Sequence, residues 1–324
     1  MRFVSKRGSS DVGLNLSTWH IPGFLKGLMP RAAIEGLQRL KGTILTRDLP
    51  RDIVFEQSPN DALASGSISI IVPIHDAPVV THRCLASLEK YASKSEVILV
   101  DDASSLAETI KIIQSFTTRN GWKVVREKKS VGHSKACAAG ALFATRPFLC
   151  LLNSDTVVTP RCWRQAKDVF DNDHRIGVAG PSTSHSGTSQ TLPVAAEVRP
   201  YWTDNQICAF AEQLLSERLE PVVMDLPWVS GFGLFIRRDL WEEVGGFDEK
   251  LPDYGNEVDL CRRIIEKGYR VVWIRNSYIH HFGEQSYRST IGREGISVRI
   301  QAGDAYNKRN KVEHPEDGVT RNSR

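Results

Sequence analysis

From Ser67 onward, short runs of apolar, mostly β-branched residues alternate with amphipathic stretches, and this rhythm limits the folds open to the chain. The apolar runs lie at 68–74, 97–100, 122–125 and 148–152, and the intervening patterns predict helices at 81–91, 105–118 and 134–145. Runs that are apolar almost throughout are typical of strands covered by helices on both faces. The pattern therefore predicts an α/β fold with a mostly parallel central sheet flanked by helices.

The composition is that of a folded globular protein. The chain has 324 residues, of which 41% are hydrophobic and 25% are charged. These values exclude a wholly disordered or fibrous chain. The net charge of +4 is spread along the whole chain, which argues against a nucleic-acid partner and leaves acidic small molecules as candidates.

The six cysteines form no C-x-x-C pair, so we expect buried, reduced thiols and a cytoplasmic protein. No secretory signal follows the amino terminus, and no apolar run reaches the ~20 residues that span a bilayer. The sequence thus predicts a cytoplasmic protein, with peripheral contact to the inner membrane face as an open alternative.

The chain divides into three parts. Residues 1–66 form an N-terminal extension, 67–287 the main domain, and 288–324 a helical or polar tail. Within the extension, residues 21–41 combine apolar residues at helical spacing with several basic ones. This segment packs on the main domain or on a partner subunit of a homo-oligomer, or it rests on anionic lipid.

Polar residues follow three of the predicted strands directly. They are His75 and Asp76, then Asp101 and Asp102, then Asn153, Ser154 and Asp155. Since the carboxyl ends of parallel strands meet at one edge of a sheet, we expect a shared polar site there. The alternative is that these acids are ordinary turn and cap residues.

The first strand is not followed by a G-x-G-x-x-G turn, and the chain has no Walker lysine loop. A bound phosphate would therefore need another source of positive charge. A divalent cation held by Asp155 is the expected device, because hard cations bind through one or two carboxylates together with phosphate oxygens.

The second half contributes two acids, Glu257 and Asp259, at the start of a helix predicted over 256–267. Glu257 is expected to point to the crevice and Asp259 to face elsewhere, unless both are ordinary first-turn acids favoured by the helix dipole. The polar stretch 180–191 has no apolar anchors and is interpreted as a mobile closing loop or a passive surface loop. Trp228 and its aromatic neighbours Phe232 and Trp241, beside Gly231, are either a sugar-binding face or core residues.

Six motifs together resemble the inverting nucleotide-sugar glycosyltransferases of family two, which have the Rossmann-like GT-A fold. They are IVPIHDA (71–77), VDDAS (100–104), LLNSDT (151–156), SGFGLFIRRDLWEEVGGFDE (230–249), NEVDLCRRIIEKGYRV (256–271) and HHFGEQS (280–286). The resemblance covers about residues 67–287. It implies a nucleotide-binding half at about 67–156 and an acceptor half at about 157–287.

The resemblance assigns roles to individual residues. Pro73, His75 and Asp76 would border the nucleoside, Asp101 and Asp102 would read base and ribose, and Asn153-Ser154-Asp155 would stand where the family has its D-x-D metal motif. Asp155 would then be a ligand of Mn2+ or Mg2+, and His281, rather than His280, a contact of the metal or diphosphate. Glu257 would be the catalytic base, while Trp228, Gly231 and Asp259 are weaker candidates for the acceptor or sugar. Ala138 stands where relatives have Asn, and Lys135 is interpreted as an exposed helical lysine with a phosphate contact as the alternative.

The implied activity is transfer of a sugar from a UDP or dTDP donor to a carbohydrate or lipid-linked glycan, with inversion, in polysaccharide biosynthesis. Two alternatives remain open. A non-catalytic nucleotide-sugar-binding scaffold fits the missing first acid of the metal motif. A sugar-phosphate nucleotidylyltransferase would need a glycine-rich, lysine-bearing loop after its first strand.

Overall fold

The computed structural model describes residues 55–198, 202–217, 219–283 and 301. The segment 21–41 lies outside the described residues, as does the tail 288–324 except for residue 301. The last three residues of the HHFGEQS motif, 284–286, also lie outside them.

One sheet runs through the described part of the chain, in the order β3-β2-β1-β4-β8-β6-β9-β5. Its first half is parallel and consists of β1 (Ile68–Ile74), β2 (Glu96–Asp101), β3 (Lys123–Arg126) and β4 (Phe148–Leu152). These strands match the four predicted apolar runs to within one residue at either end. Their carboxyl ends meet at one edge of the sheet, as expected.

The second half of the sheet is mixed. β8 (Gly233–Arg237) is antiparallel to both β4 and β6 (Ile176–Ser182), whereas β6 is parallel to β9 (Arg270–His281). The short strands β5 (Thr156–Val158) and β7 (Val223–Asp225) both pair antiparallel with β9. The predicted α/β fold class is confirmed, and its parallel part is confined mainly to β1–β4.

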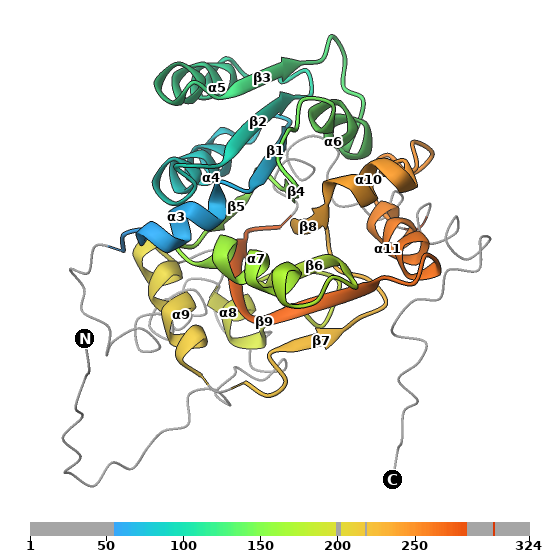
Figure 1. Cartoon of the computed structure of the whole chain (residues 1–324). Coiled ribbons are helices and arrows are strands. Elements are labelled where there is room, and N and C mark those ends of the chain that lie inside the picture. The colour runs from blue at the N-terminus through green and yellow to red at the C-terminus, as the bar shows by residue number, and fades with distance from the viewer. Residues whose placement is uncertain (1–54, 199–201, 218, 284–300, 302–324) are drawn as a thin grey trace, which may run out of the picture.

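Helices cover both faces of this sheet (Figure 1). One face carries α4 (Pro78–Tyr91), α5 (Ala107–Asn120) and α7 (Cys162–Asn172), and the other carries α6 (His133–Ala141), α10 (Arg238–Val244) and α11 (Asn256–Glu266). Strand β1 alternates between the two cores, with Ile70 and Val72 in the first and Ile71 in the second. A third apolar cluster surrounds α8 (Pro193–Val198) and α9 (Asp204–Ser216).

The run from Ser58 to Asp61, which reads as a loop in the sequence, is instead the start of helix α3 (Pro59–Ser65). Ser58 caps the helix by accepting a hydrogen bond from the Asp61 backbone N–H at 3.2 Å, and Pro59 occupies the first position. Phe55 lies in the core beside β1. The last residues of the predicted extension are therefore packed on the main domain.

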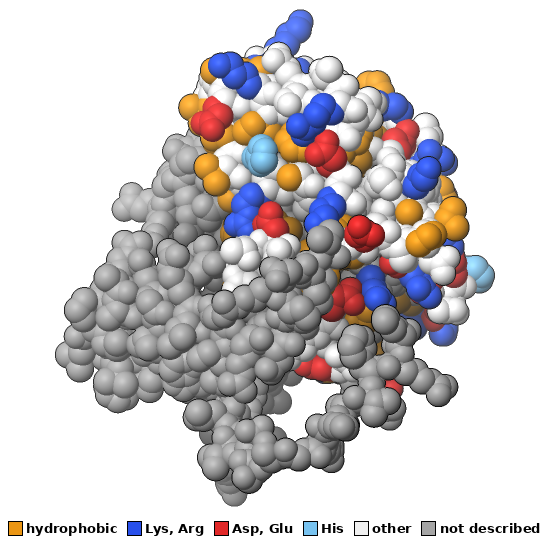
Figure 2. Space-filling view, turned by 90° about the vertical axis from the view of Figure 1, so that its left-hand side faces the viewer, with side chains coloured by type: hydrophobic (Ala, Val, Ile, Leu, Met, Phe, Trp, Pro, Cys, Tyr) orange, Lys and Arg blue, Asp and Glu red, His pale blue; other side chains and the backbone are white. Residues whose placement is uncertain are grey.

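The structure also describes the cysteines, part of the surface charge and the length of the helices. All six cysteines are buried and free, as predicted. On the face in Figure 2, basic and acidic side chains are interspersed among apolar ones rather than gathered by sign. Among the described residues, none of the helices has the length and apolar character that crossing a bilayer requires.

Candidate functional site

The acids at the tips of β1 and β2 build the loops around them. The Asp76 carboxylate accepts hydrogen bonds from the backbone N–H groups of Ser105 at 2.9 Å and Leu106 at 2.8 Å. It thereby satisfies donors at the start of α5, where the chain otherwise has no side-chain cap. Asp76 itself has a φ of 54°, so a strained turn brings its carboxylate to this position.

Asp101 and Asp102 serve two different loops. Asp101 pairs with the Arg126 guanidinium and accepts from the Ser104 N–H at 2.8 Å. Asp102 accepts from the loop before α6, at 2.8 Å from Ser130 Oγ, 2.6 Å from the Val131 N–H and 3.2 Å from the Gly132 N–H. The predicted base-reading and ribose-reading carboxylates are therefore bonded within the protein.

The half-buried His75 joins these two strand tips. Its Nδ1 lies 2.7 Å from the Asp102 carbonyl oxygen, which can only accept, so the proton is on Nδ1 and Nε2 keeps a lone pair. Pro73, two residues before His75 in β1, pairs with Val100 of β2.

Asp155 and His281 face each other across the β5–β9 pair. His281 Nδ1 lies 2.7 Å from the His185 carbonyl oxygen, so it donates there. That Nε2 lies 3.1 Å from Asp155 Oδ1. The Asp155 carbonyl accepts from the Phe282 N–H at 2.9 Å, which ties the two loops together.

This pair fits two neighbouring ligands of one cation. Two acceptor atoms at 3.1 Å need a proton or a cation between them, and adjacent ligands of an octahedral ion with bonds of ~2.1 Å lie ~3.0 Å apart. A histidine whose other nitrogen donates to a backbone carbonyl is the usual arrangement of a metal ligand. The described residues hold no cluster of three or more His, Cys, Asp or Glu side chains able to take a metal.

His280 points away from this pair, because successive strand residues face opposite sides of the sheet. Its Nδ1 lies 2.9 Å from Tyr278 Oη, and its ring packs edge-on against Phe282 at 4.8 Å. His281 is thus the one of the two histidines that lies beside Asp155, and its contact with a metal or diphosphate stays a prediction.

The stretch 180–191 has no apolar anchors, as expected, but polar side chains hold it in place. Ser184 is fully buried, accepts from the His281 N–H at 3.0 Å and donates to the His281 carbonyl at 2.9 Å. Gln190 is also fully buried and donates to the Pro181 carbonyl at 2.8 Å. Polar side chains bonded to the backbone anchor this loop in place of apolar ones, and the loop fixes the orientation of His281.

Glu257 lies at the first turn of α11, half-buried, and its Oε1 accepts from the Gly231 N–H at 3.0 Å. Burial raises the pKa of the Glu257 carboxyl, which the positive potential of His133 partly offsets. Gly231 is needed at this contact, because a Cβ there would lie 2.7 Å from Glu257 Oε1. The carboxylate is thus held at the edge of the sheet with a proton affinity above that of a solvated acid.

Two polar residues to which the sequence analysis assigned no role, His133 and Asn256, connect the two halves together with Asn153. His133 begins α6 and lies between the metal-motif loop and α11: its Nε2 is 3.2 Å from Asn153 Oδ1, and its Nδ1 is 3.3 Å from Asn256 Nδ2. Asn256 is fully buried and also donates to Ser134 Oγ at 2.9 Å. Asn153 Nδ2 lies 3.4 Å from His281 Nε2.

Opposing influences act on the protonation of His133. Burial lowers the pKa of its imidazole, but the Cys137 sulfur and the carboxylates of Glu257 and Asp253 raise it to about 9. His133 and Glu257 thus stabilise each other's charged forms.

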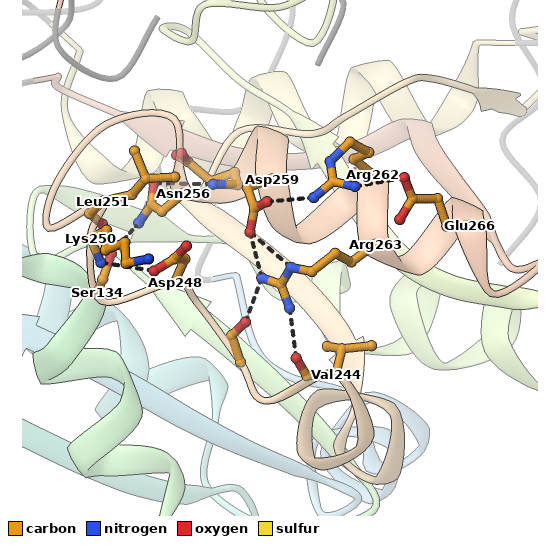
Figure 3. Close-up of polar contacts among 12 residues, drawn as sticks. Ser134, Val244, Asp248, Lys250, Leu251, Asn256, Asp259, Arg262, Arg263 and Glu266 are labelled. Carbon is orange, nitrogen blue, oxygen red and sulfur yellow. Dashed lines mark hydrogen bonds and ion pairs between the residues drawn. The ribbon is translucent and has the colours of Figure 1, made fainter. Parts of the chain in front are cut away.

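Asp259 belongs to the framework rather than to the crevice (Figure 3). Its carboxylate accepts from Arg262 at 2.9 Å and from Arg263 at 2.8 Å, and Arg263 also donates to the carbonyls of Val244 and Gly246, both at 2.7 Å. The acid therefore ties α11 to the turn after α10. This agrees with the expectation that Asp259 faces away from Glu257.

The remaining candidates are mostly packed. Trp241 lies in the core against Phe247, with ring centroids 5.2 Å apart, and Phe232 stacks on the His281 ring at 5.4 Å. Trp228 is buried in the same cluster as Trp241. Lys135 forms an exposed ion pair with Glu249 at 3.2 Å.

Comparison with known proteins gives consistent results. The sequence model described as glycosyl transferase family 2 matches residues 69–239. An N-acetylglucosaminyl-diphospho-decaprenol L-rhamnosyltransferase of Mycobacterium tuberculosis is 35% identical over 86 residues, covering 26% of this chain and 27% of that protein. The pre-mycofactocin glycosyltransferase of the same species is 24% identical over 255 residues, covering 78% of this chain and 50% of its own. The chain thus spans half or less of these relatives.

Two solved structures share the fold. A mannosyltransferase from Pyrobaculum calidifontis, in complex with GDP-Man and Mn2+, has a TM-score of 0.54 at 14% identity, covering 88% of this chain and 74% of that one. GalNAc-T7 with UDP, GalNAc and Mn2+ has a TM-score of 0.52 at 17% identity, covering 66% of this chain and 43% of that one.

Proposed function

Since the chain belongs to glycosyl transferase family 2 and has the GT-A fold, we propose that it moves a sugar from a nucleoside diphosphate donor to a carbohydrate or lipid-linked acceptor, with inversion. The observation that carries this proposal is the convergence of Asp155, His281 and Glu257 on one edge of the sheet. Hydrogen bonds through Asn153, His133 and Asn256 link the first two to the helix of the third.

Asp155 and His281 would hold a divalent cation, Mn2+ or Mg2+, with diphosphate oxygens and water completing its shell. When bound, the cation would supply Lewis-acid stabilisation of the charge that develops on the leaving diphosphate. The His185 carbonyl keeps the His281 lone pair on Nε2, and Phe232 supports the ring from one face. The Mn2+ named with both solved neighbours supports this part of the proposal.

Glu257 would accept the proton of the attacking acceptor hydroxyl. A half-buried carboxylate with a raised pKa is suited to this role, because its proton affinity is closer to that needed near neutral pH. The Gly231 N–H holds Oε1, so the carboxylate is oriented before the acceptor binds. With the base on the acceptor side and in-line attack, the anomeric centre would invert.

The nucleoside would lie against the tips of β1 and β2, bordered by Pro73, His75, Asp76, Asp101 and Asp102. The bare Nε2 of His75 suits an imide N–H of uracil or thymine, or a ribose hydroxyl. We expect a UDP or dTDP donor, with which this pairing is compatible. The acceptor would approach from the side of Gly231 and Trp228. The reaction would belong to polysaccharide biosynthesis and would take place near the inner membrane face.

The test is turnover of a panel of nucleotide sugars by the purified protein with Mn2+, measured as release of nucleoside diphosphate. We expect one donor to be hydrolysed or transferred, and Asp155→Ala to lose this activity. Asp168→Ala, which removes an exposed acid from α7, is the matched control and should leave it intact.

Other outcomes of this test would indicate another function or another metal ligand. Release of pyrophosphate would indicate a nucleotidylyltransferase, and donor binding without turnover would indicate a scaffold. Activity that survives Asp155→Ala would remove the assigned metal ligand.

A further inference from the structure

Ser134, in the first turn of α6, bonds to three residues of the segment 251–256, through which the chain enters α11. Its hydroxyl donates to the Leu251 carbonyl and accepts from Asn256 Nδ2 at 2.9 Å (Figure 3). Its backbone N–H donates to the Pro252 carbonyl at 2.8 Å. Because the residue is only 1% exposed, these bonds are shielded from competing water. We call the segment 251–256 the entry segment, and Ser134 holds both of its ends.

The Asn256 amide extends this contact to the backbone of Glu257. While its NH2 group donates to Ser134 Oγ, its Oδ1 accepts from the Glu257 N–H at 3.1 Å. The two contacts require the same orientation of the amide, because the Ser134 proton is used on the Leu251 carbonyl and a backbone N–H can only donate. The N-cap Gly255 has no side chain to satisfy the first turn of α11. Asn256, which is fully buried, supplies that acceptor.

The start of α6 is also packed closely against the entry segment. Gly132 precedes the helix with a φ of 86°, and a Cβ there would lie 3.1 Å from Pro252 Cβ and 3.2 Å from the Pro252 carbonyl oxygen. Asp253 Oδ1 accepts from the His133 N–H at 3.3 Å, which satisfies a donor at the start of α6. The entry segment therefore contacts α6 through backbone groups as well as through Ser134.

We propose that Ser134 is a positioning residue for Glu257: it fixes the entry segment and, through Asn256, the first turn of α11. This inference rests on the proposed function for the role of Glu257 as the base. The Gly231 N–H orients the carboxylate at its end, and the Ser134 contact places the backbone from which the side chain extends. With both constraints, the base has its geometry before the acceptor binds.

The experiment compares Ser134→Ala with Ser69→Ala, because both serines are buried and each hydroxyl donates one hydrogen bond and accepts one. Ser69 Oγ donates to Glu96 Oε2 at 2.6 Å and accepts from the Arg146 N–H at 3.1 Å, near the amino end of β1 and away from the site. We expect both changes to lower the melting temperature. Only Ser134→Ala should lower kcat, by about tenfold, with the KM for the donor unchanged, because a misplaced base slows the chemical step.

Two further measurements separate positioning from a general loss of stability. In the Glu257→Gln background, Ser134→Ala should change the residual kcat by less than about twofold, since its effect acts through the carboxylate. Hydrogen exchange of the Gly231 N–H, which needs no substrate, should be about tenfold faster in Ser134→Ala than in the wild type or Ser69→Ala. Asn256→Ser, with one polar atom where Asn256 uses two, should show the same loss of kcat and the same faster exchange.

Equal kcat values in folded Ser134→Ala and Ser69→Ala would overturn the proposal, as would an undiminished effect of Ser134→Ala in the Glu257→Gln background. If Ser134→Ala does not fold, Asn256→Ser decides between the same outcomes. Absence of turnover with every donor would remove the proposed function, and the exchange of the Gly231 N–H would still test the placement of Glu257. Unchanged exchange in the folded variants would then overturn the proposal by itself.

Discussion

The acids of the two halves of the site differ in what they bind. At the tips of β1 and β2, Asp76, Asp101 and Asp102 accept hydrogen bonds from backbone N–H groups of the loops that follow. Asp155, on the β5–β9 side, lies 3.1 Å from His281 Nε2, and Glu257 is oriented by one glycine N–H. The acids at the tips of β1 and β2 therefore hold loops in place, whereas Asp155 and Glu257 are the acids for which we propose chemistry.

Among the variants that test this difference between the two groups of acids, Glu257→Gln is expected to have the largest effect on activity. The amide cannot accept a proton but keeps an oxygen for the Gly231 N–H, so the fold should be unchanged. We expect kcat to fall by about 10³-fold, within the range for loss of a general base. Steady-state kinetics would measure it, with Glu266→Gln on the exposed side of the same helix as control. A kcat within twofold of the wild type would exclude Glu257 as the base.

Asp102→Ala should show the opposite pattern, with its main effect on stability. Three donors of the loop 130–132 lose their acceptor. We expect the free energy of unfolding to fall by about 3 kcal/mol, and the melting temperature by roughly 10 °C. Thermal unfolding followed by circular dichroism measures this, with the exposed Asp171→Ala as control. An unchanged melting temperature would show that the carboxylate does not support the loop.

Gly231→Ala tests the backbone contact that orients Glu257. The new Cβ would lie 2.7 Å from Glu257 Oε1 and displace the end of a flexible side chain, so the protein should fold. A displacement of ~1 Å at the base is expected to lower kcat by about 100-fold. Gly66→Ala, beside Leu63 and away from the crevice, provides the control for both kinetics and melting. Equal kcat values for the two variants would count against the contact.

The pH dependence of kcat tests the raised pKa of Glu257. Burial raises this pKa above the ordinary value of 4.5, and the base works only when ionised. Activity should therefore fall as pH decreases, with a midpoint above 4.5. The residual activity of Glu257→Gln should not show this fall at low pH. A midpoint at or below 4.5 would mean that the carboxylate is solvated like a surface acid.

The sequence allowed the parallel half of the sheet to be predicted closely, because fully apolar runs mark strands buried on both faces. The same edge could be located from the polar residues after those runs. What those residues bind could not be predicted, since the partners of Asp102 and Asp76 are loop N–H groups set by backbone conformation. The start of α3 was misjudged, although Ser58-Pro59 is a recognisable helix start.

The links through His133 and Asn256 were also missed. His133 follows Gly132 at a helix start beside the predicted edge, and this position is a local signal for a site residue. Its partners Asn153 and Asn256 lie on other elements, so only the folded arrangement joins them. The anchoring of 180–191 has the same origin: Ser184 bonds to both backbone groups of His281, far along the chain.

The central claim is that the cation belongs to Asp155 and His281 and not to the acids at the tips of β1 and β2. Mn2+ titration of the nucleotide-free protein, followed by electron paramagnetic resonance, compares Asp155→Ala directly with Asp102→Asn. The account predicts that Asp155→Ala abolishes the bound-ion signal and that folded Asp102→Asn keeps the wild-type dissociation constant. Retained binding in Asp155→Ala, with loss in Asp102→Asn, would contradict it.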